Sequence, residues 1–434
     1  MDAVVVSLVL LVVITLVLLG GLWVSLSLVA VGLVGMVLFT SAPAGTVMAT
    51  TIWGASGSWA LTSLPLFIWM AEILFRTRLS EDMFRGLAPW MAPLPGRLMH
   101  VPVVGCAIFS AVSGSNAATC ATVAKIALPE LLRRGYDEKM SVGALTASGT
   151  LGILIPPSIL MIVYGFIAEV SIARLFIAGV IPGIVISALF MGYVVYWAWR
   201  YPHRTPPNDI SMTFTERVWA SRRLIPVTGL IVLVMGTIYG GIATPTEAAT
   251  IGVIGALALS WIYGTLTWSS FVESLAGTTQ TSCMIAFILA GASFLTIALG
   301  YTGVPKAAAA LITSQQLGVY GLLTALTALY VLLGFALDGI SMVVLTSSVV
   351  QPMIRQAGVD PVWFGIYITL LVQVAELTPP VGFPMFVMQQ MTGRSLAYVA
   401  RASLPFFWLL LVGTAIIVVW PALVTWLPDR MLNP

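Results

Sequence analysis

The sequence predicts an all-α integral membrane protein made of two inverted repeats, each with a re-entrant hairpin and a broken helix. Hydrophobic residues make up 59% of the 434 residues and charged residues only 8%, with a mean hydropathy of +1.03, whereas soluble proteins carry roughly 25% charged residues. The apolar runs are long and lack the alternation typical of a membrane β-barrel. Polar, glycine-rich interruptions recur at matching positions in the two halves of the chain.

The composition also argues against nucleic-acid binding, disulfide bonds and a histidine-based metal site. A net charge of +3 is too small to indicate a nucleic-acid partner. The three cysteines (Cys106, Cys120 and Cys283) are scattered through apolar sequence and predict no disulfide. The two histidines, His100 and His203, are too few and too far apart to indicate a metal site.

Ordinary spans are expected where about 20 apolar residues run together. The start of the chain lacks a basic region and a cleavage signal, so we interpret it as a first span and not as a signal peptide. In the first repeat the spans fall at 4–19, 22–39, about 60–74 and 175–199, with a connection rich in Gly, Ser and Thr over 41–58. Charged and apolar residues mix over 76–100, which favours an amphipathic helix at the membrane surface over a solvated loop.

A hairpin is predicted at 98–130, where apolar sequence is broken at its centre by Ser113, Gly114, Ser115 and Asn116. Basic clusters flank this segment on both sides, and a single crossing would place them on opposite sides of the membrane. A re-entrant hairpin keeps both clusters on one side, provided that its tip is buried in protein or lines a cavity.

A broken helix is predicted at 140–168, which is long enough to span but carries Pro156 and Pro157 in its middle. A proline inside a helix removes a hydrogen bond and clashes with the preceding turn. We therefore expect two half-helices here, within a first repeat that covers 1–200.

The second half is expected to follow the same order after a cytoplasmic linker at 201–221. The second repeat, 222–434, is predicted to hold spans at 224–239, 248–263 and 282–299, a polar stretch at 300–316, a re-entrant hairpin at 319–353, a broken helix at 362–390 and a last span at 404–427.

Residues that set backbone shape recur at one spacing. Pro156 lies 223 residues before Pro379. The same offset relates Pro129 to Pro352, Gly135 to Gly358, Asp137 to Asp360 and Pro157 to Pro380, and it places Ser115 on Asp338 and Asn116 on Gly339. We interpret this as a duplication, and an odd number of crossings per half inverts the second copy.

The basic residues predict the orientation, because loops on the cytoplasmic side carry an excess of Lys and Arg. With the linker in the cytoplasm, most basic residues lie inside. Lys125 falls within the first hairpin, and only Arg174, Lys306, Arg355 and Arg430 fall outside. The two hairpins then enter the membrane from opposite faces and reach toward one central site.

Breaks in membrane helices are typical of a transporter's binding site. Free carbonyls and hard oxygen ligands suit an alkali cation, while half-helix N-termini suit an anionic substrate. The candidate cation-binding residues are Ser113, Ser115, Asn116, Thr150, Gly152, Asp338, Gly339, Thr378 and Gly382. The candidate substrate-binding residues are Ser115, Asn116, Pro156, Pro157, Ser158, Pro379 and Pro380.

Structural roles compete with several of these assignments. Asp338, the most informative carboxylate, could instead be a hairpin cap, and Ser or Thr hydroxyls in membrane helices often bond a preceding carbonyl. Glu376, one turn before Pro379, is left open as a further site residue. Glu247 fits a helix start after Pro245, and Gly143 is better explained by close helix packing.

Five motifs are informative together: Ser113-Gly114-Ser115-Asn116-Ala117-Ala118-Thr119, Arg134-Gly135-Tyr136-Asp137, Gly149-Thr150-Leu151-Gly152-Ile153-Leu154-Ile155-Pro156-Pro157-Ser158, Thr244-Pro245-Thr246-Glu247-Ala248-Ala249 and Leu377-Thr378-Pro379-Pro380-Val381-Gly382. They resemble the motifs of one known family, the large membrane subunits of tripartite ATP-independent periplasmic (TRAP) transporters. The resemblance covers nearly the whole chain. Asn116 departs from it, standing where many relatives have a small residue.

The resemblance implies a sodium-coupled symporter of the bacterial inner membrane that works by an elevator movement and needs no cofactor beyond sodium. It implies two partners, a small four-helix membrane subunit and a periplasmic binding protein that delivers an organic acid. A stand-alone carboxylate carrier or antiporter of the same superfamily is the alternative. An enzyme is not expected, because the chain lacks His-Glu-x-x-His and Gly-x-Ser-x-Gly motifs.

Overall fold

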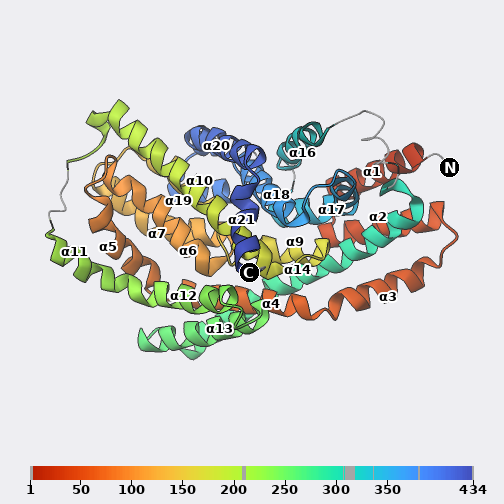
Figure 1. The fold of residues 1–434 in the computed structure, drawn as a ribbon, viewed down its shortest axis with the longest axis horizontal. Helices are drawn as coiled ribbons and strands as arrows, with labels where there is room; N and C mark the ends of the chain where they lie inside the picture. Colours follow the sequence, from red (N-terminus) through yellow and green to blue (C-terminus); the bar gives the residue numbers. More distant parts are fainter. Residues whose placement is uncertain are drawn as a thin grey trace.

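The computed structural model describes residues 3–207, 212–305, 307, 318–335, 337–379 and 382–432, and all the regular structure in these ranges is helical. Figure 1 shows an elongated bundle with the N-terminal helices at one end. Three residues named above, Lys306, Pro380 and Val381, lie outside the described part of the chain, as does most of the polar stretch 300–316.

The first helices are α1 (Ala3–Leu19), α2 (Val24–Phe39), α3 (Ala44–Ser56) and α4 (Ser63–Phe75). The prediction of a connection over 41–58 is wrong, because most of this segment forms α3. Backbone amides in an apolar environment must be satisfied within the segment, and the hydroxyls of Thr50 and Ser56 bond back to carbonyls four residues earlier. Helix α3 meets the helical segment Trp59–Phe75, which consists of the 3-10 turn η1 (Trp59–Thr62) and α4, at a bend of 51°.

The segment expected at the membrane surface contains α5 (Leu79–Met91). One face of α5 buries Leu79, Met83 and Leu87, while Arg85 pairs with Glu81 on the exposed face at 2.5 Å. The helical, amphipathic character of this segment is therefore confirmed.

Two spans of the second half differ from expectation. Helix α14 runs over Trp268–Thr302, well before the expected start at 282, because a capping box at Thr267 and Ser270 begins the helix in polar sequence. The last predicted span is divided into α20 (Leu396–Val419) and α21 (Ala422–Leu432). Pro421 follows directly after the break, and the residue before a proline disfavours helix.

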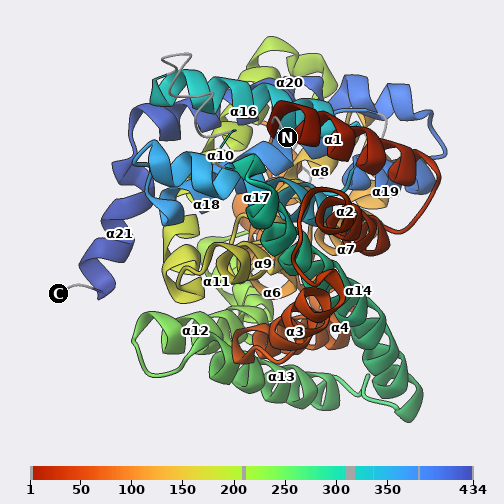
Figure 2. The same cartoon turned by 90° about the vertical axis from the view of Figure 1, so that its right-hand side faces the viewer.

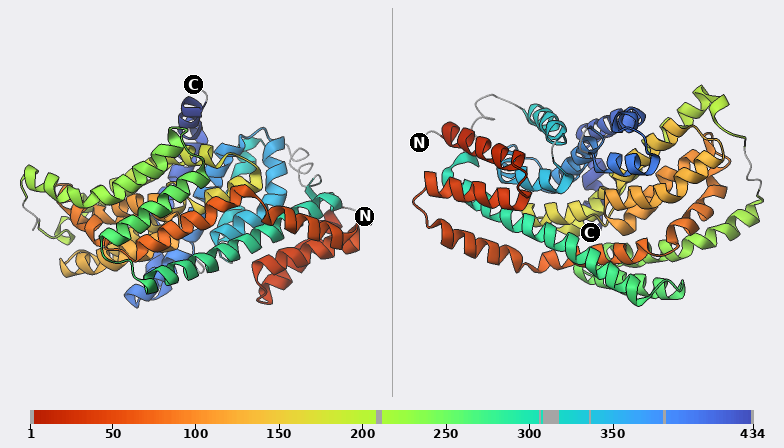
Figure 3. Two further views of the ribbon diagram at one scale, coloured as in Figure 1. Left: turned by 90° about the horizontal axis from the view of Figure 1, so that it is seen from below. Right: turned by 180° about the vertical axis from the view of Figure 1, so that it is seen from behind.

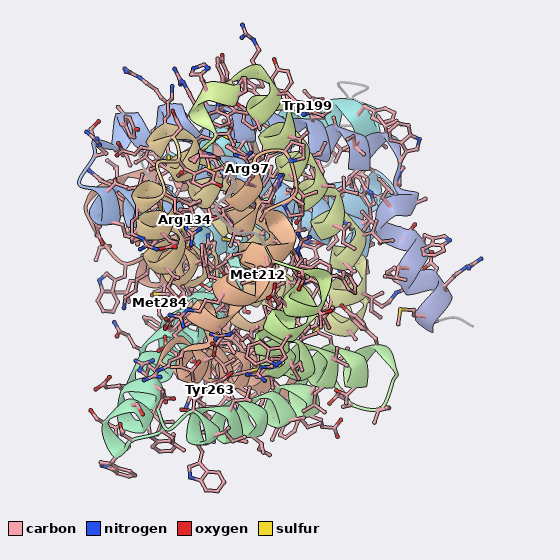
Figure 4. All side chains as sticks on the ribbon, turned by 90° about the vertical axis from the view of Figure 1, so that its left-hand side faces the viewer. Arg97, Arg134, Trp199, Met212, Tyr263 and Met284 are labelled. Carbon is pink, nitrogen blue, oxygen red and sulfur yellow. The ribbon has the colours of Figure 1, made fainter. Side chains whose placement is uncertain are left out.

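The other long helices are α10 (Ile172–Arg200), α12 (Ile225–Tyr239) and α13 (Pro245–Ile262). Helix α13 begins with a capping box of Thr244 and Glu247, which confirms the role expected for Glu247. The segment taken as a linker holds a short helix, α11 (Phe214–Ser221). Figure 4 looks onto the face where Arg97, Arg134 and Met212 lie.

The centre of each half consists of four shorter helices. They are α6 (His100–Ser113), α7 (Asn116–Arg133), α8 (Glu138–Gly149) and α9 (Ile159–Ala168) in the first half, and α16 (Val319–Leu333), α17 (Gly339–Gln356), α18 (Pro361–Glu376) and α19 (Phe383–Thr392) in the second. Both ends of α17 lie 223 residues after the corresponding ends of α7.

The helices form two packed groups, and both halves of the chain contribute to each. In one group α14 packs along α2, α3 and α4, with α13 against α4 (Figure 2). In the other, α7 packs on α8 and α19, α8 on α20, and α9 on α17. Close approaches hold the second group together: a Cβ at Gly143 would lie 2.2 Å from the Ala402 carbonyl oxygen, which confirms the packing role of this glycine. Helix α21 projects from the bundle (Figure 3).

Several helices are long and apolar enough to cross a membrane. Within the described ranges, five qualify by length and composition, and the bent pair of α3 and α4 makes up to six. The expected spans at 4–19 and 22–39 are helices of only 17 and 16 residues. Of the halves of the broken helices, α18 also has 16 residues and α8, α9 and α19 are shorter. The chain is a multi-pass membrane protein.

A candidate cation and substrate site where helix breaks meet

The turn between α6 and α7 packs against the break that follows α8. A Cβ at Gly152 would lie 2.5 Å from the Ser115 carbonyl oxygen and 2.7 Å from the Asn116 nitrogen. On the other side of the break, the Ile159 amide donates to the Gly114 carbonyl at 3.1 Å. Gly114, Ser115, Asn116 and Gly152 are therefore brought together, as the site prediction requires.

Local backbone geometry explains this turn. Gly114 ends α6 at a φ of +61°, a left-handed conformation that glycine adopts without strain. A side chain there would also collide with the Pro157 carbonyl oxygen at 2.8 Å. Ser115 is extended and is the N-cap of α7, but its side chain makes no hydrogen bond to the helix. The first amides of α7 therefore receive no hydrogen bond from this residue's side chain.

The polar side chains near this turn already have local partners. The Ser113 and Thr119 hydroxyls are 2.5 Å apart, and the Thr150 hydroxyl donates to the Ala147 carbonyl at 2.7 Å. The Asn116 Oδ1 accepts from the Ala117 amide at 2.7 Å. Thr150 therefore makes the hydrogen bond to a preceding carbonyl that is the structural alternative to cation binding. A hydroxyl that donates in this way still has lone pairs with which it can bind a cation.

In the second half, Asp338 is the N-cap of α17. Its carboxylate accepts from the amides of Ile340 and Ser341 at 3.1 and 3.2 Å, and from the Ser341 hydroxyl. The residue is exposed. Asp338 therefore caps α17, which is the alternative to cation binding that the sequence offered. Its carboxylate lies at the start of this helix.

The turn before α17 packs against the end of α18. A Cβ at Gly339 would lie 2.5 Å from Val372 Cγ1 and 3.0 Å from Oε1 of Glu376. A Cβ at Gly382, the N-cap of α19, would lie only 1.9 Å from the Glu376 carbonyl oxygen. The Thr378 hydroxyl donates to the Ala375 carbonyl at 2.5 Å. The second set of candidate residues, Gly339, Thr378 and Gly382, is therefore arranged around Glu376.

Glu376 joins the two halves of the site. Its side chain, on α18, lies close to Asn116 at the start of α7 and to Asp338 at the start of α17, and both influence the carboxyl. The residue is only 6% exposed. The sequence leaves Glu376 open as a site residue, although it carries a signal: it is a single carboxylate at the end of an apolar helix.

Two half-helix N-termini meet at the same place. Helices α7 and α19 start at N-caps, Ser115 and Gly382, that provide no side-chain hydrogen bond. The helices pack together, with Cys120 Sγ 3.8 Å from the Pro384 carbonyl oxygen one turn inside α7. The remaining first-turn amides and the positive ends of the two helix dipoles suit an anion. The Ala117 amide is bonded to Asn116 Oδ1, and at α19 Pro384 has no amide hydrogen and the Met385 amide is bonded to the Gly382 carbonyl.

The proline residues at the breaks differ in their surroundings. Pro156 and Pro157 are joined by a cis peptide bond. Ser158 is fully buried and caps α9, accepting from the Met161 amide at 3.3 Å and donating to the Ile153 carbonyl at 2.6 Å. Pro379 is exposed. Of α7, α8 and α9, which flank the two breaks of the first half, α7 alone starts without a side-chain cap.

The available ligands are hard oxygens and backbone amides. Among the residues that the structure describes, no group of three or more His, Cys, Asp or Glu side chains could hold a metal ion. Carboxylate, hydroxyl and carbonyl oxygens suit an alkali cation better than a transition metal. Oxygen atoms of the kind that a monovalent cation prefers therefore lie beside the helix N-termini that suit an organic anion.

Comparison with known proteins identifies the class of protein. Residues 10–423 match the family described as "Tripartite ATP-independent periplasmic transporter, DctM component". The C4-dicarboxylate TRAP transporter large permease protein DctM of Pseudomonas aeruginosa is 29% identical over 383 residues, which are 88% of this chain and 89% of that protein. The ectoine TRAP transporter large permease protein TeaC of Halomonas elongata is 32% identical over 372 residues, which are 85% of this chain and 86% of that protein.

The fold resembles a solved structure as well. The YdaH transporter of Alcanivorax borkumensis superposes with a TM-score of 0.68 at 14% identity, and the match covers 96% of this chain and 99% of that one. At this identity the likeness concerns the fold alone. Together with the family match, these findings show that the chain belongs to the DctM family and is the large permease subunit of a TRAP transporter, not an enzyme.

Proposed function

We propose that this subunit imports an organic acid together with sodium ions by an elevator mechanism. The observation that carries the proposal is the convergence of α7, α17, α18 and α19 on Glu376. Helix ends from both halves of the chain meet there, with carbonyl oxygens for cations and free amides for an anion.

The sodium ions bind at the two places where a turn packs on a break. The first site lies near Ser113, Ser115, Asn116, Thr150 and Gly152, and the second near Asp338, Gly339, Thr378 and Gly382. The support is the close approach of Ser115 to Gly152 and of Gly339 and Gly382 to the end of α18. Both places offer only hard oxygens, which suit an alkali cation.

The substrate carboxylate binds at the uncapped N-termini of α7 and α19. Ser115 and Asn116 contact it, and Pro156, Pro157, Ser158, Pro379 and Pro380 shape the adjoining breaks. The names of the relatives agree with a substrate of this kind, since one is a C4-dicarboxylate permease and another an ectoine permease. Cation and anion then neutralise one another before they move through the membrane.

The two halves act as inverted repeats, 1–200 and 222–434, around a cytoplasmic linker at 201–221. The segments 98–130 and 319–353 are re-entrant hairpins from opposite faces, and 140–168 and 362–390 are the broken helices. The equal spacing of α7 and α17 supports this. The group around α14 is the scaffold, and the group of α7, α8, α9, α17 and α19 moves within it in the inner membrane.

The subunit acts with a small four-helix membrane protein and a periplasmic binding protein. Support comes from the family, whose description names a tripartite periplasmic system. Both partners are therefore included in the experiment that tests the proposal.

The test is uptake of radiolabelled succinate and ectoine into liposomes that hold both membrane subunits, with the binding protein outside. An inward sodium gradient is expected to drive uptake, and an inward proton gradient without sodium is not. Equal uptake with either gradient would show that the coupling ion is wrong. Full uptake by the large subunit alone would indicate the stand-alone carrier.

A further inference from the structure

We propose that Glu376 is the charged ligand of the second cation site, and that the turns of both halves share this ligand. The inference rests on the proposed function and deepens it, because it assigns the alkali cation to a carboxylate that joins the two halves. The supporting observations are the burial, the free oxygen and the neighbours of Glu376.

Glu376 is buried, and one of its oxygens has no partner. The side chain is 6% exposed, and Oε2 makes no hydrogen bond among the described residues. The other contacts come from two separate turns, with Asn116 on one side and Gly339 on the other. A buried carboxylate oxygen without a partner is costly, and a cation supplies the missing interaction.

The charges around Glu376 are all of one sign. Asp338, at the start of α17, is a second acidic side chain near enough to act on Glu376. None of the ion pairs found in the described ranges includes Glu376. Two neighbouring acidic groups without a basic partner are stabilised by a proton or by a bound cation. A sodium ion at Oε2 supplies this stabilisation.

Backbone oxygens complete the set of ligands. Gly382 lets the start of α19 approach the Glu376 carbonyl, since a Cβ there would lie 1.9 Å from that oxygen. Thr378 lies two residues beyond Glu376 in the chain and is only 7% exposed, so its hydroxyl lies in a buried region. Carbonyl and hydroxyl oxygens of the same short segment are therefore available as further ligands beside the Glu376 carboxyl.

The shared ligand has a functional consequence. Asn116 belongs to the turn of the first half and Gly339 to that of the second, and both contact the same carboxyl. A cation at Glu376 therefore stabilises the arrangement in which the two turns are held together. Occupancy of this site prepares the adjacent N-terminus of α7 for the substrate carboxylate.

The test is binding of radioactive sodium to the purified full-length chain in detergent, at fixed pH, for wild type, Glu376→Gln and Glu376→Asp. Glu376→Gln is expected to raise the half-saturating sodium concentration about tenfold or more, in line with the loss of a ligand interaction. Glu376→Asp keeps the charge and is expected to retain part of the binding. The control is Glu169→Gln, which removes an exposed carboxylate at the end of α9 and is expected to bind as wild type does.

Thermal unfolding separates a ligand role from a structural one. In sodium-free buffer Glu376→Gln is expected to unfold at the same temperature as wild type or higher, because it removes a buried charge that nothing neutralises. Added sodium is expected to raise the midpoint of wild type far more than that of the variant. The assignment would be overturned if Glu376→Gln unfolded at a lower temperature than wild type without sodium and if added sodium raised its unfolding midpoint as much as that of wild type.

The outcomes also separate this inference from the proposed function. Unchanged sodium binding by Glu376→Gln would refute the role of Glu376 and leave sodium coupling intact. Absence of binding of sodium, lithium or potassium by wild type would refute the proposed cation coupling and this inference with it.

Discussion

The close contact between Gly152 and the turn before α7 offers a sharp test of the first cation site. In Gly152→Ala the new Cβ would lie 2.5 Å from the Ser115 carbonyl oxygen, whereas ordinary contact begins at 3.4 Å. The turn must therefore retreat by about 0.9 Å, the difference between these distances. Inserting a methyl group into a well-packed region costs about 1–3 kcal/mol.

If this free energy destabilises only the conformation that binds sodium, the affinity for sodium decreases by about 5- to 150-fold. The matched control is Gly192→Ala, in the interior of α10, because nothing lies within 4 Å of a Cβ at that position. In a helix interior the change from glycine to alanine is neutral or favourable by about 0.5–1 kcal/mol.

The assay is the initial rate of uptake as a function of sodium concentration in the reconstituted three-component system, with thermal unfolding of each purified variant beside it. We expect Gly152→Ala to need a higher sodium concentration for half-maximal uptake, and Gly192→Ala to follow wild type. Identical sodium curves for all three proteins would show that the contact of Gly152 with Ser115 does not contribute to cation binding.

Three further predictions concern charge, topology and partners. Asp338→Asn keeps a good helix cap but removes the charge, so it is expected to weaken sodium activation with little loss of thermal stability; an unchanged sodium curve would leave Asp338 as a cap only. Single cysteines at Arg78 and Arg217 in a Cys283→Ser background are expected to resist an impermeant thiol reagent outside intact cells, and those at Arg174 and Arg430 to react; the opposite pattern would reverse the orientation. The purified large subunit alone is expected not to take up succinate or ectoine in liposomes, and the two partners are expected to restore uptake, unless the chain is a stand-alone carrier.

The positions of the helix breaks follow from local chemistry, which is why sequence could predict them. Gly114 and Pro156 act on the backbone of their own segment, and both lie where helices end in the structure. The same holds for the capping box of Thr244 and Glu247. The role of such residues can be predicted from the sequence because it does not depend on contacts with distant segments.

Other features depend on packing between distant segments, and sequence could not assign them. Glu376 contacts Asn116, which lies 260 positions earlier in the chain, so its place at the junction appears only in the fold. Helix α3 forms in sequence rich in Gly and Thr because a membrane environment requires internal hydrogen bonds. For Asp338 the sequence offers the cap of α17 as the alternative role, whereas its exposure depends on packing and is seen only in the fold.

The central claim is that the turns of the two halves meet at one shared site, and cross-linking tests it most directly. The variant carries Ser115→Cys and Asp338→Cys in a Cys283→Ser background, since Cys106 and Cys120 are buried. A protease site is inserted within the linker at 201–221. The control replaces Asp338→Cys by Ala357→Cys, 19 residues farther along the chain at the other end of α17, which corresponds to roughly 28 Å of helix.

After treatment with a short bifunctional thiol reagent and cleavage of the linker, the two halves are separated on a denaturing gel. The account predicts that the halves of the Ser115 and Asp338 pair remain joined, while those of the control pair separate. Separation of the halves in both variants would contradict a shared site.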